Sequence, residues 1–490
     1  MRKCGILLSI SSLPSPYGIG TLGASAYRFV DFLKRSGHTF WQILPLSPVS
    51  FGDSPYQSFS AFAFNPYYID PDFLVSDGLL TKDECLSYDF GCDETLVDYA
   101  LLYENRHLLL KKAANRFDTH DGEFVKFCEE NSFWLDDYSV FMTAKEMNGM
   151  RALSELPENL KKREEEALRK FKTENKKLID YYKITQYLFF SQWIKLRRYA
   201  KDMGVHIIGD IPVYVSEDSS DVWAQPELFS VDENLKVKLS AGCPPDDFSK
   251  DGQLWGNPVY EWKKHEETKY DWWIKRLKQA SSLFDVTRID HFRGLYSYYA
   301  VPPGEATAKN GSWFHADGER LIEKIKSELP DMKIIAEDLG FITHDIRERM
   351  EKSGFPGMKI LQFGFDTDPQ NEHLPHNYTR NTVAYTGTHD NSTVVGWLSS
   401  AKKECVSFAL DYFGVNFIKN LPKAMIRGLF SSVSDTVIVP FQDYLGQGDD
   451  KRMNVPSTLG GNWQYRITDY DMSEKLSDKL YRLAKTYSRL

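Results

Sequence analysis

Short apolar segments recur along the chain, and each has the length and composition of a buried β-strand. They are bounded by turn residues and are rich in Val, Ile, Leu and Phe. The eight segments span 5–10, 40–46, 205–213, 284–290, 333–337, 358–365, 382–388 and 436–441. Eight such strands alternating with helices are typical of a (β/α)8, or TIM, barrel. The pattern therefore predicts an α/β fold built on eight strands.

Amphipathic segments lie between many of these strands. In the segment 24–35, the apolar residues Ala26, Phe29, Val30 and Leu33 fall on one helical face, and Gly37 follows as a stop signal. This spacing predicts a helix that packs against the sheet.

The distance between the second and third predicted strands is far longer than one crossover helix requires. We therefore predict a single catalytic barrel domain over 1–490, with a helical insertion at 70–200. Within this region, 158–177 is highly charged and predicts a solvated helix, whereas 178–203 is apolar and aromatic and predicts a helix packed on the barrel. A second insertion at 214–283 carries a loop around 246–258 that we expect to cover the substrate.

Composition and charge narrow the class of ligand. The 490 residues are 42% hydrophobic with a net charge of -9, and the basic residues are scattered. This balance argues against nucleic acid or an anionic membrane as the main partner. The six cysteines form no C-x-x-C pair and no segment has the roughly 18 apolar residues of a membrane span, so we expect reduced thiols and a cytoplasmic protein.

Polar residues follow the predicted strands, and a barrel gathers such residues at one mouth. The set comprises Asp210, Arg288, Asp290, Glu337, Asp338, His389, Asp390, Gln442 and Asp443. Several carboxylates at one mouth suit retaining glycoside chemistry, with Asp290 and Glu337 as the pair that supplies nucleophile and acid/base. The alternative for any single residue is a capping or ion-paired role at a strand end.

Aromatic residues in Pro/Gly-rich loops suit a sugar ligand, because pyranose C–H faces stack on such rings. Tyr56, Trp255 and Trp463 stand in such loops, and Gly252 and Gly256 predict an irregular loop around Trp255. The alternative is that each is a core residue. No phosphate-binding, dinucleotide-binding, zinc-protease or serine-hydrolase motif is present, so we expect no cofactor.

Longer motifs resemble one family. Those shared with α-amylases as well are 288–294 (RIDHFRG) and 388–391 (THDN), and 336–340 (AEDLG) accompanies them. The specific ones are 52–58 (GDSPYQS), 244–246 (PPD), 252–258 (GQLWGNP) and 440–446 (PFQDYLG). Together they resemble the amylomaltases, the 4-α-glucanotransferases of glycoside hydrolase family 77, over nearly the whole chain.

This resemblance implies transfer of an α-1,4-glucan segment to the 4-hydroxyl of glucose or another glucan, without a metal. It implies that Asp290 is the nucleophile, Glu337 the general acid/base and Asp390 the stabiliser of the transition state. The substrate contacts that it implies are Tyr56, Asp210, Asp246, Gln253, Trp255, Arg288, His389 and Asn462. One departure is Ser457, where the family usually has glycine, and this affects the turn beside Asn462.

Two alternatives remain open on the residues alone. An α-amylase-like hydrolase would share the barrel and the three carboxylates, and the segments specific to amylomaltases count against it. A glucan-binding protein without catalysis would keep the aromatic cleft, and the presence of all three carboxylates counts against it.

Overall fold

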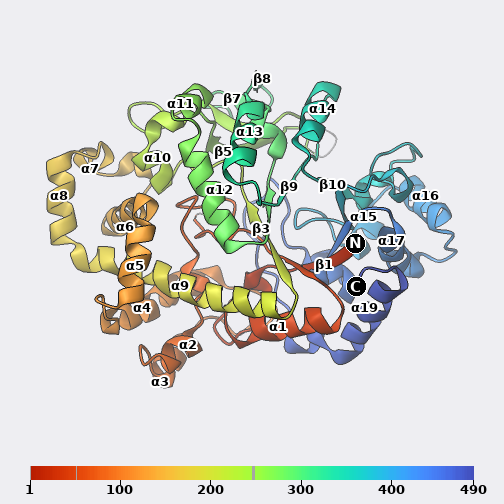
Figure 1. The fold of residues 1–490 in the computed structure, drawn as a ribbon, viewed down its shortest axis with the longest axis horizontal. Coiled ribbons are helices and arrows are strands. Elements are labelled where there is room, and N and C mark those ends of the chain that lie inside the picture. Colours follow the sequence, from red (N-terminus) through yellow and green to blue (C-terminus); the bar gives the residue numbers. More distant parts are fainter. Residues whose placement is uncertain (1, 51, 246–248, 341) are drawn as a thin grey trace.

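The computed structural model describes residues 2–50, 52–245, 249–340 and 342–490. Its centre is an eight-stranded parallel sheet in the order β10-β11-β12-β1-β2-β3-β6-β9. The strands are β1 Lys3–Leu7, β2 Phe40–Gln42, β3 His206–Ile211, β6 Val286–Ile289, β9 Ile334–Ala336, β10 Gly357–Ile360, β11 Thr382–Tyr385 and β12 Thr436–Pro440. Each lies within or beside one of the eight predicted segments, and helices surround them (Figure 1).

The two end strands of this sheet meet, so the sheet curls into a barrel. The backbone N–H of Ala336 in β9 donates to the carbonyl of Pro356, just before β10, at 2.9 Å. The Asp338 side chain strengthens the same junction, since its Oδ1 accepts from the N–H of Met358 at 2.6 Å. The predicted (β/α)8 barrel is confirmed.

Strands end earlier than their apolar runs predict. β2, for example, stops at Gln42 although Ile43, Leu44 and Leu46 are also buried. An apolar run in the sequence indicates buried residues, whereas the ends of a strand are set by its hydrogen bonds to neighbouring strands. The residues just beyond the strands are therefore free to form the mouth of the barrel.

The helix predicted at 24–35 is α1, Ala24–Arg35, with Phe29, Val30 and Leu33 buried on the sheet side. The segment between β2 and β3 is helical. Its helices are α2 Pro71–Ser76, α3 Lys82–Leu86, α4 Tyr99–Arg116, α5 Gly122–Glu130, α6 Ser132–Met147, α7 Glu158–Lys161, α8 Glu165–Glu174 and α9 Lys176–Asp202.

The longest of these helices, α9, packs on the barrel. The indole N–H of Trp193 donates to the carbonyl of Leu283 at 3.2 Å, and its ring lies edge-on to Phe284. The charged α8 has no buried residue, as its composition predicts. We infer that the helices between β2 and β3 belong to one domain with the barrel, because Trp193 is fully buried in their interface.

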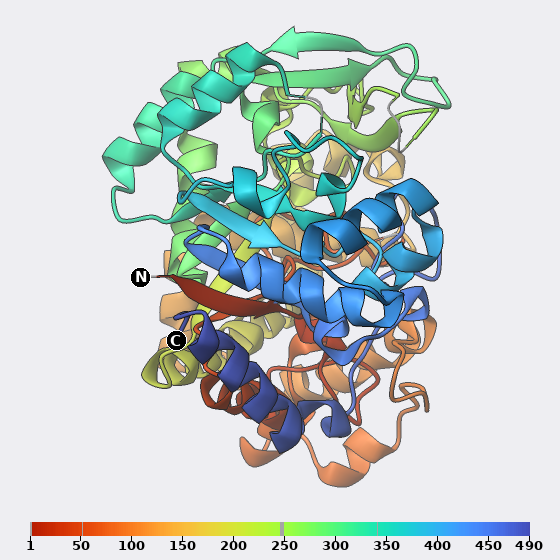
Figure 2. The same cartoon turned by 90° about the vertical axis from the view of Figure 1, so that its right-hand side faces the viewer.

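A four-stranded antiparallel sheet, which the sequence pattern did not predict, lies at one end of the molecule (Figure 2). Its order is β5-β4-β7-β8, with β4 Ser240–Cys243, β5 Gln253–Pro258, β7 Ser297–Val301 and β8 Ser312–His315. The prediction that Trp255 lies in an irregular loop is wrong, because Trp255 is in β5. Gly256 has φ +81° and the β4–β5 register shifts nearby, so this glycine belongs to an irregular strand.

The remaining helices complete the outer layer. They are α10 Ser220–Ala224, α11 Trp262–Glu267, α12 Asp271–Leu283, α13 Gly318–Glu328, α14 His344–Ser353, α15 Val394–Ser400, α16 Lys403–Phe413, α17 Leu421–Ser431, α18 Phe441–Leu445 and α19 Glu474–Thr486. Within the described ranges, no helix is both apolar enough and long enough to cross a bilayer.

Candidate active site

Arg288 is the centre of the polar cluster at the mouth of the barrel. It lies on β6, and because strand side chains alternate, it shares a face with Asp290 two residues later. Its Nη1 lies 2.6 Å from Asp210 Oδ2, and its Nη2 lies 2.8 Å from Asp290 Oδ1 and 2.8 Å from Glu337 Oε2. One buried guanidinium thus gathers three carboxylates from the ends of three neighbouring strands.

Asp290 and Glu337 are close enough for a retaining pair. Each presents an oxygen 2.8 Å from the same Arg288 nitrogen, so these two oxygens lie no more than twice that distance apart. An inverting pair needs roughly 6.5–9.5 Å, to leave room for a water between the carboxyl groups. The geometry therefore suits direct attack by one carboxylate on the sugar.

The Asp290 carboxyl group retains its proton to an unusually high pH. Burial, and then the adjacent Glu337 carboxylate, raise the pKa of Asp290 to about 7, although Arg288 opposes the shift. A hydrogen bond between the two side chains contributes to this increase. Near neutral pH the Asp290 carboxyl group is therefore protonated in part of the molecules, in hydrogen-bond contact with Glu337.

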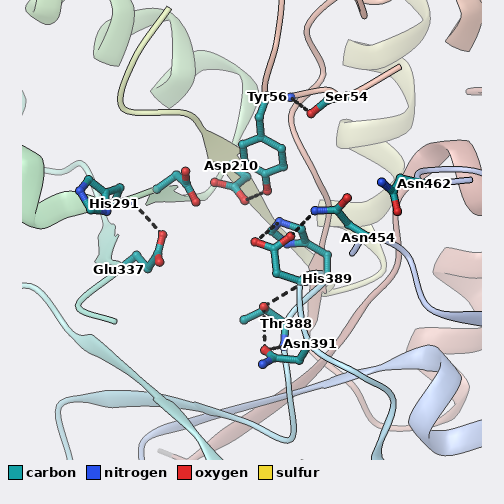
Figure 3. Close-up of polar contacts among 12 residues, drawn as sticks. Ser54, Tyr56, Asp210, His291, Glu337, Thr388, His389, Asn391, Asn454 and Asn462 are labelled. Atoms are coloured by element: carbon teal, nitrogen blue, oxygen red, sulfur yellow. Dashed lines mark hydrogen bonds and ion pairs between the residues drawn. The ribbon is translucent and has the colours of Figure 1, made fainter. Parts of the chain in front are cut away.

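The backbone at His291 holds Glu337 in place. His291 has φ +45°, in the left-handed region that is unfavourable for a non-glycine residue, and its N–H donates to Glu337 Oε2 at 2.7 Å (Figure 3). Arg288 donates to the same oxygen. Glu337 Oε2 thus has two donors, and Oε1 is the oxygen able to carry a proton toward a ligand.

Asp390 follows β11 and lies across the mouth from this pair. Its Oδ1 accepts from Asn454 Nδ2 at 2.6 Å, and its Oδ2 lies 3.4 Å from His389 Nε2. Burial opposes ionisation, but the His389 imidazole and these hydrogen bonds lower the pKa of Asp390 to about 2. Asp390 therefore stays ionised, and 44% of its side chain remains exposed.

An aromatic wall borders the cluster. The ring of Tyr56 stacks on His389 with centroids 5.0 Å apart, and both rings pack at a tilt against Trp463. The Tyr56 hydroxyl donates to Asp210 Oδ2 at 2.7 Å (Figure 3). Asp210 Oδ1 is buried without a hydrogen-bond partner among the described residues, so it has the capacity to accept from a ligand hydroxyl.

The second predicted group of substrate contacts lies on β5. Trp255 Nε1 donates to Gln253 Oε1 at 3.1 Å, and the Trp255 ring lies edge-on to His291 at 4.9 Å. Gln57 fastens this strand to the 52–58 loop by donating to the carbonyl of Trp255 at 3.0 Å. Asp246, predicted beside them, lies outside the described residues.

Asn462 has a different position from the other predicted contacts. Its Oδ1 accepts from the N–H of Val455, and its Nδ2 donates to the carbonyl and hydroxyl oxygens of Thr458. The amide therefore holds the 454–462 loop together. Ser457 in this loop has φ +63°, which explains why glycine would suit the position.

Two carboxylates expected at the mouth are engaged by hydrogen bonds to neighbouring elements. Asp338 binds the backbone of β10, as described above, and Asp443 accepts from Val394 N and Thr386 Oγ1. Burial raises the pKa of Asp443 to about 6. Both act at strand and helix ends, which is the alternative that the sequence left open for them.

Several residues of the site were not identified from the sequence. Asn454 positions Asp390, and Arg452 donates from Nε to the Asn454 carbonyl at 2.7 Å. Asn454 stands three residues before Ser457, the position that departs from the family. It is 64 residues from Asp390 in the chain, so nothing in the sequence indicated their contact. Among the residues that the structure describes, no group of three or more His, Cys, Asp or Glu side chains could hold a metal ion.

Comparison with known proteins gives one consistent result. A sequence model described as 4-alpha-glucanotransferase, glycoside hydrolase family 77, matches residues 8–472. A 4-alpha-glucanotransferase of Clostridium butyricum is 47% identical over 98% of this chain and 100% of its own length, and that of Thermus thermophilus is 41% identical over 100% and 99%. The solved structure of an amylomaltase from Streptococcus agalactiae in complex with acarbose has a TM-score of 0.97 at 44% identity, covering 100% of both chains.

Proposed function

The chain belongs to the 4-α-glucanotransferases of glycoside hydrolase family 77, and from this premise we propose that Asp290, Glu337 and Asp390 carry the transfer of an α-1,4-glucan segment. The observation that supports this assignment most is the Arg288 guanidinium, which holds Asp290 and Glu337 by one nitrogen. A retaining mechanism needs two carboxyl groups at this separation.

In the first step, Asp290 attacks the anomeric carbon of the donor sugar. Because Arg288 occupies Oδ1, Oδ2 is the oxygen free to attack. Glu337 Oε1 gives its proton to the glycosidic oxygen, and the reducing-end part of the glucan leaves. The Arg288 charge favours the ionised form of Asp290 as the proton moves to Glu337.

In the second step, the 4-hydroxyl of an acceptor glucose or glucan replaces the leaving group. Glu337 now accepts the hydroxyl proton, and the acceptor oxygen displaces Asp290 from the anomeric carbon. Two inversions at that carbon retain the α-linkage. Asp390, ionised on the opposite side, stabilises the positive charge that develops on the sugar ring.

We propose that the other residues hold the glucan. Asp210 and His389 accept and donate to sugar hydroxyls, and Tyr56, Trp255 and Gln253 line the cleft. Asn462 acts through the loop that carries Asn454. We also propose a cytoplasmic location, since the cysteines other than Cys243 are free thiols, and no nucleic-acid partner, since the net charge is -9.

The test of function is incubation of the purified protein with maltotriose alone. Glucose together with longer maltooligosaccharides, at a constant number of reducing ends, is the expected result. A rising number of reducing ends without longer products would indicate a hydrolase, and unchanged maltotriose that still binds would indicate a binding protein.

The pH dependence of kcat/KM is expected to show a fall as the pH rises through about 7. The pKa of Asp290 is raised, so this carboxyl group keeps a proton below that pH and loses it above. We propose that this is the proton that Glu337 passes to the leaving group, so its loss lowers the rate. Asp390 remains ionised down to about pH 2 and does not contribute to the profile near neutrality. Initial rates on maltotriose between pH 5 and 9 measure this decrease in kcat/KM.

Asp443 provides the control for the pH profile, since burial raises the pKa of this carboxyl to about 6. In the Asp443→Asn variant, kcat/KM should decrease at the same pH as in the wild type. If the decrease disappears in this variant, it belongs to Asp443. A wild-type profile without any decrease would contradict the proposed transfer of the Asp290 proton.

Replacing Asn454 by alanine is expected to lower kcat about 10- to 100-fold, because a hydrogen bond to a charged group contributes about 1.5–3 kcal/mol. The bond from Asn454 to Asp390 Oδ1 is lost, while Asp390 itself remains. Thr458→Ala is the matched control, since it loosens the same loop without touching Asp390. Equal losses in both variants would show that the loop, and not the contact, is responsible.

A further inference from the structure

A groove on the outer side of the barrel, between α9, α5 and α1, lies outside the catalytic site. Its volume is about 550 Å³, within the range of about 300–1,000 Å³ that is typical of small-molecule sites. The last residue of α9, Asp202, precedes the first residue of β3, His206, so this end of the groove faces the N-terminal ends of the strands. The catalytic mouth is at the opposite, C-terminal ends.

The groove follows one face of α9. Its lining residues on this helix run from Tyr187 to Asp202 at spacings of three and four, which is a continuous stripe of about 22 Å at 1.5 Å per residue. The facing side of α5 has the same spacing, and α1 contributes Tyr27. Figure 1 shows α9 extending from the neighbourhood of α5 toward α1.

Aromatic rings form much of the floor. Tyr27, Tyr187, Phe190 and Tyr199 are half-buried, so each keeps part of its surface open to the groove. The rings of Tyr27 and Tyr199 lie 5.0 Å apart at 47° to one another. Half-exposed rings along a concave surface suit the C–H faces of sugars.

Charged side chains form the rim, and none of them makes a hydrogen bond or an ion pair within the described part of the chain. They are Glu123, Lys126, Glu130, Lys195, Arg198 and Asp202. Three are acidic and three are basic, so the rim has no net formal charge. This balance suits a neutral ligand rich in hydroxyl groups, and it disfavours nucleic acid, anionic lipid or a strongly charged peptide.

We propose that this groove is a second binding site for an α-1,4-glucan chain, separate from the catalytic cleft. The proposal rests on the proposed function, because glucan is the neutral, hydroxyl-rich polymer on which the enzyme acts. The rings of the floor stack on the sugar units, and the unpaired rim groups bind their hydroxyls. A long glucan held there keeps the enzyme on its polymeric substrate, whereas maltotriose is too short to use both sites.

The test compares long and short substrates in the full-length enzyme. The variants are Tyr27→Ala with Arg198→Ala, and Arg198→Ala alone, which removes no side-chain hydrogen bond or ion pair among the described residues. We expect kcat/KM on amylose to fall about three- to tenfold in the double variant, as loss of a stacked aromatic predicts, with kcat/KM on maltotriose unchanged. Retardation in native gels that contain amylose should fall in parallel.

Tyr470→Ala with Arg482→Ala is the matched control, because Tyr470 is 90% exposed and neither residue lines the groove. This control should behave as the wild type on both substrates. Unchanged amylose kinetics and gel retardation in the groove variants would overturn the second site, even while maltotriose transfer is normal. Absence of maltotriose transfer in the wild type would instead contradict the proposed function.

Discussion

Asp290→Asn is expected to abolish glucan transfer, with a loss of more than about 10⁴-fold in kcat. The amide has nearly the shape of the carboxylate and can still accept from Arg288, so the site should remain assembled. It is a poor nucleophile, however, and no covalent glycosyl-enzyme can form. The measurement is the rate of maltotriose disproportionation, with thermal unfolding to verify that the variant is folded.

Asp338→Asn is the matched control for this substitution. It makes the same chemical change at a carboxylate that follows a barrel strand, but Asp338 accepts from Met358 N and does not face the cleft. The asparagine oxygen can take over that role, so activity should be preserved. Equal losses in both variants, or near-normal activity in Asp290→Asn, would contradict the assignment of the nucleophile.

Glu337→Gln is expected to lower transfer from natural glucans by about 10²- to 10⁴-fold, the usual contribution of a general acid/base. The effect should depend on the leaving group. An α-maltosyl fluoride donor needs no protonation, so it should still react with Asp290 in this variant. The second step then lacks its base, and the glycosyl-enzyme should accumulate.

Mass spectrometry of the intact protein and of its peptides measures this accumulation. The maltosyl group is expected on the peptide that contains Asp290. Azide, a nucleophile that needs no base, should release it and restore turnover. If the label appears on another carboxylate, or if Asp290→Asn also becomes labelled, the roles of the two residues are wrong.

The strands and the central site residues could be predicted because both depend on local pattern. Burial in the barrel makes each strand an apolar run, and the segment 288–294 places Arg288 and Asp290 two residues apart on one strand face. This alternation alone indicates that both side chains point the same way, whatever the rest of the chain does.

The β4–β8 sheet could not be predicted in the same way. Its strands are four to six residues long, and β8 is exposed throughout. Gly256 in β5 and Gly252 just before it both have positive φ. Short strands without a continuous apolar face have no clear periodicity. Their pairing depends on partners that are up to about sixty residues away in the chain, and pairing of that kind is set by tertiary contacts.

By itself, the sequence determined the barrel, the family and the three candidate carboxylates, since strand periodicity and compact motifs are local properties of a chain. Only the tertiary structure decided which oxygen of each carboxylate is free and what holds it. The contacts that hold these oxygens join residues far apart in the chain. Glu337 is held by the Arg288 guanidinium and by the His291 N–H, 46 residues away, and Asp390 by the Asn454 amide, 64 residues away. A hydrogen bond depends on distance and angle in space, and these are established only when the barrel closes.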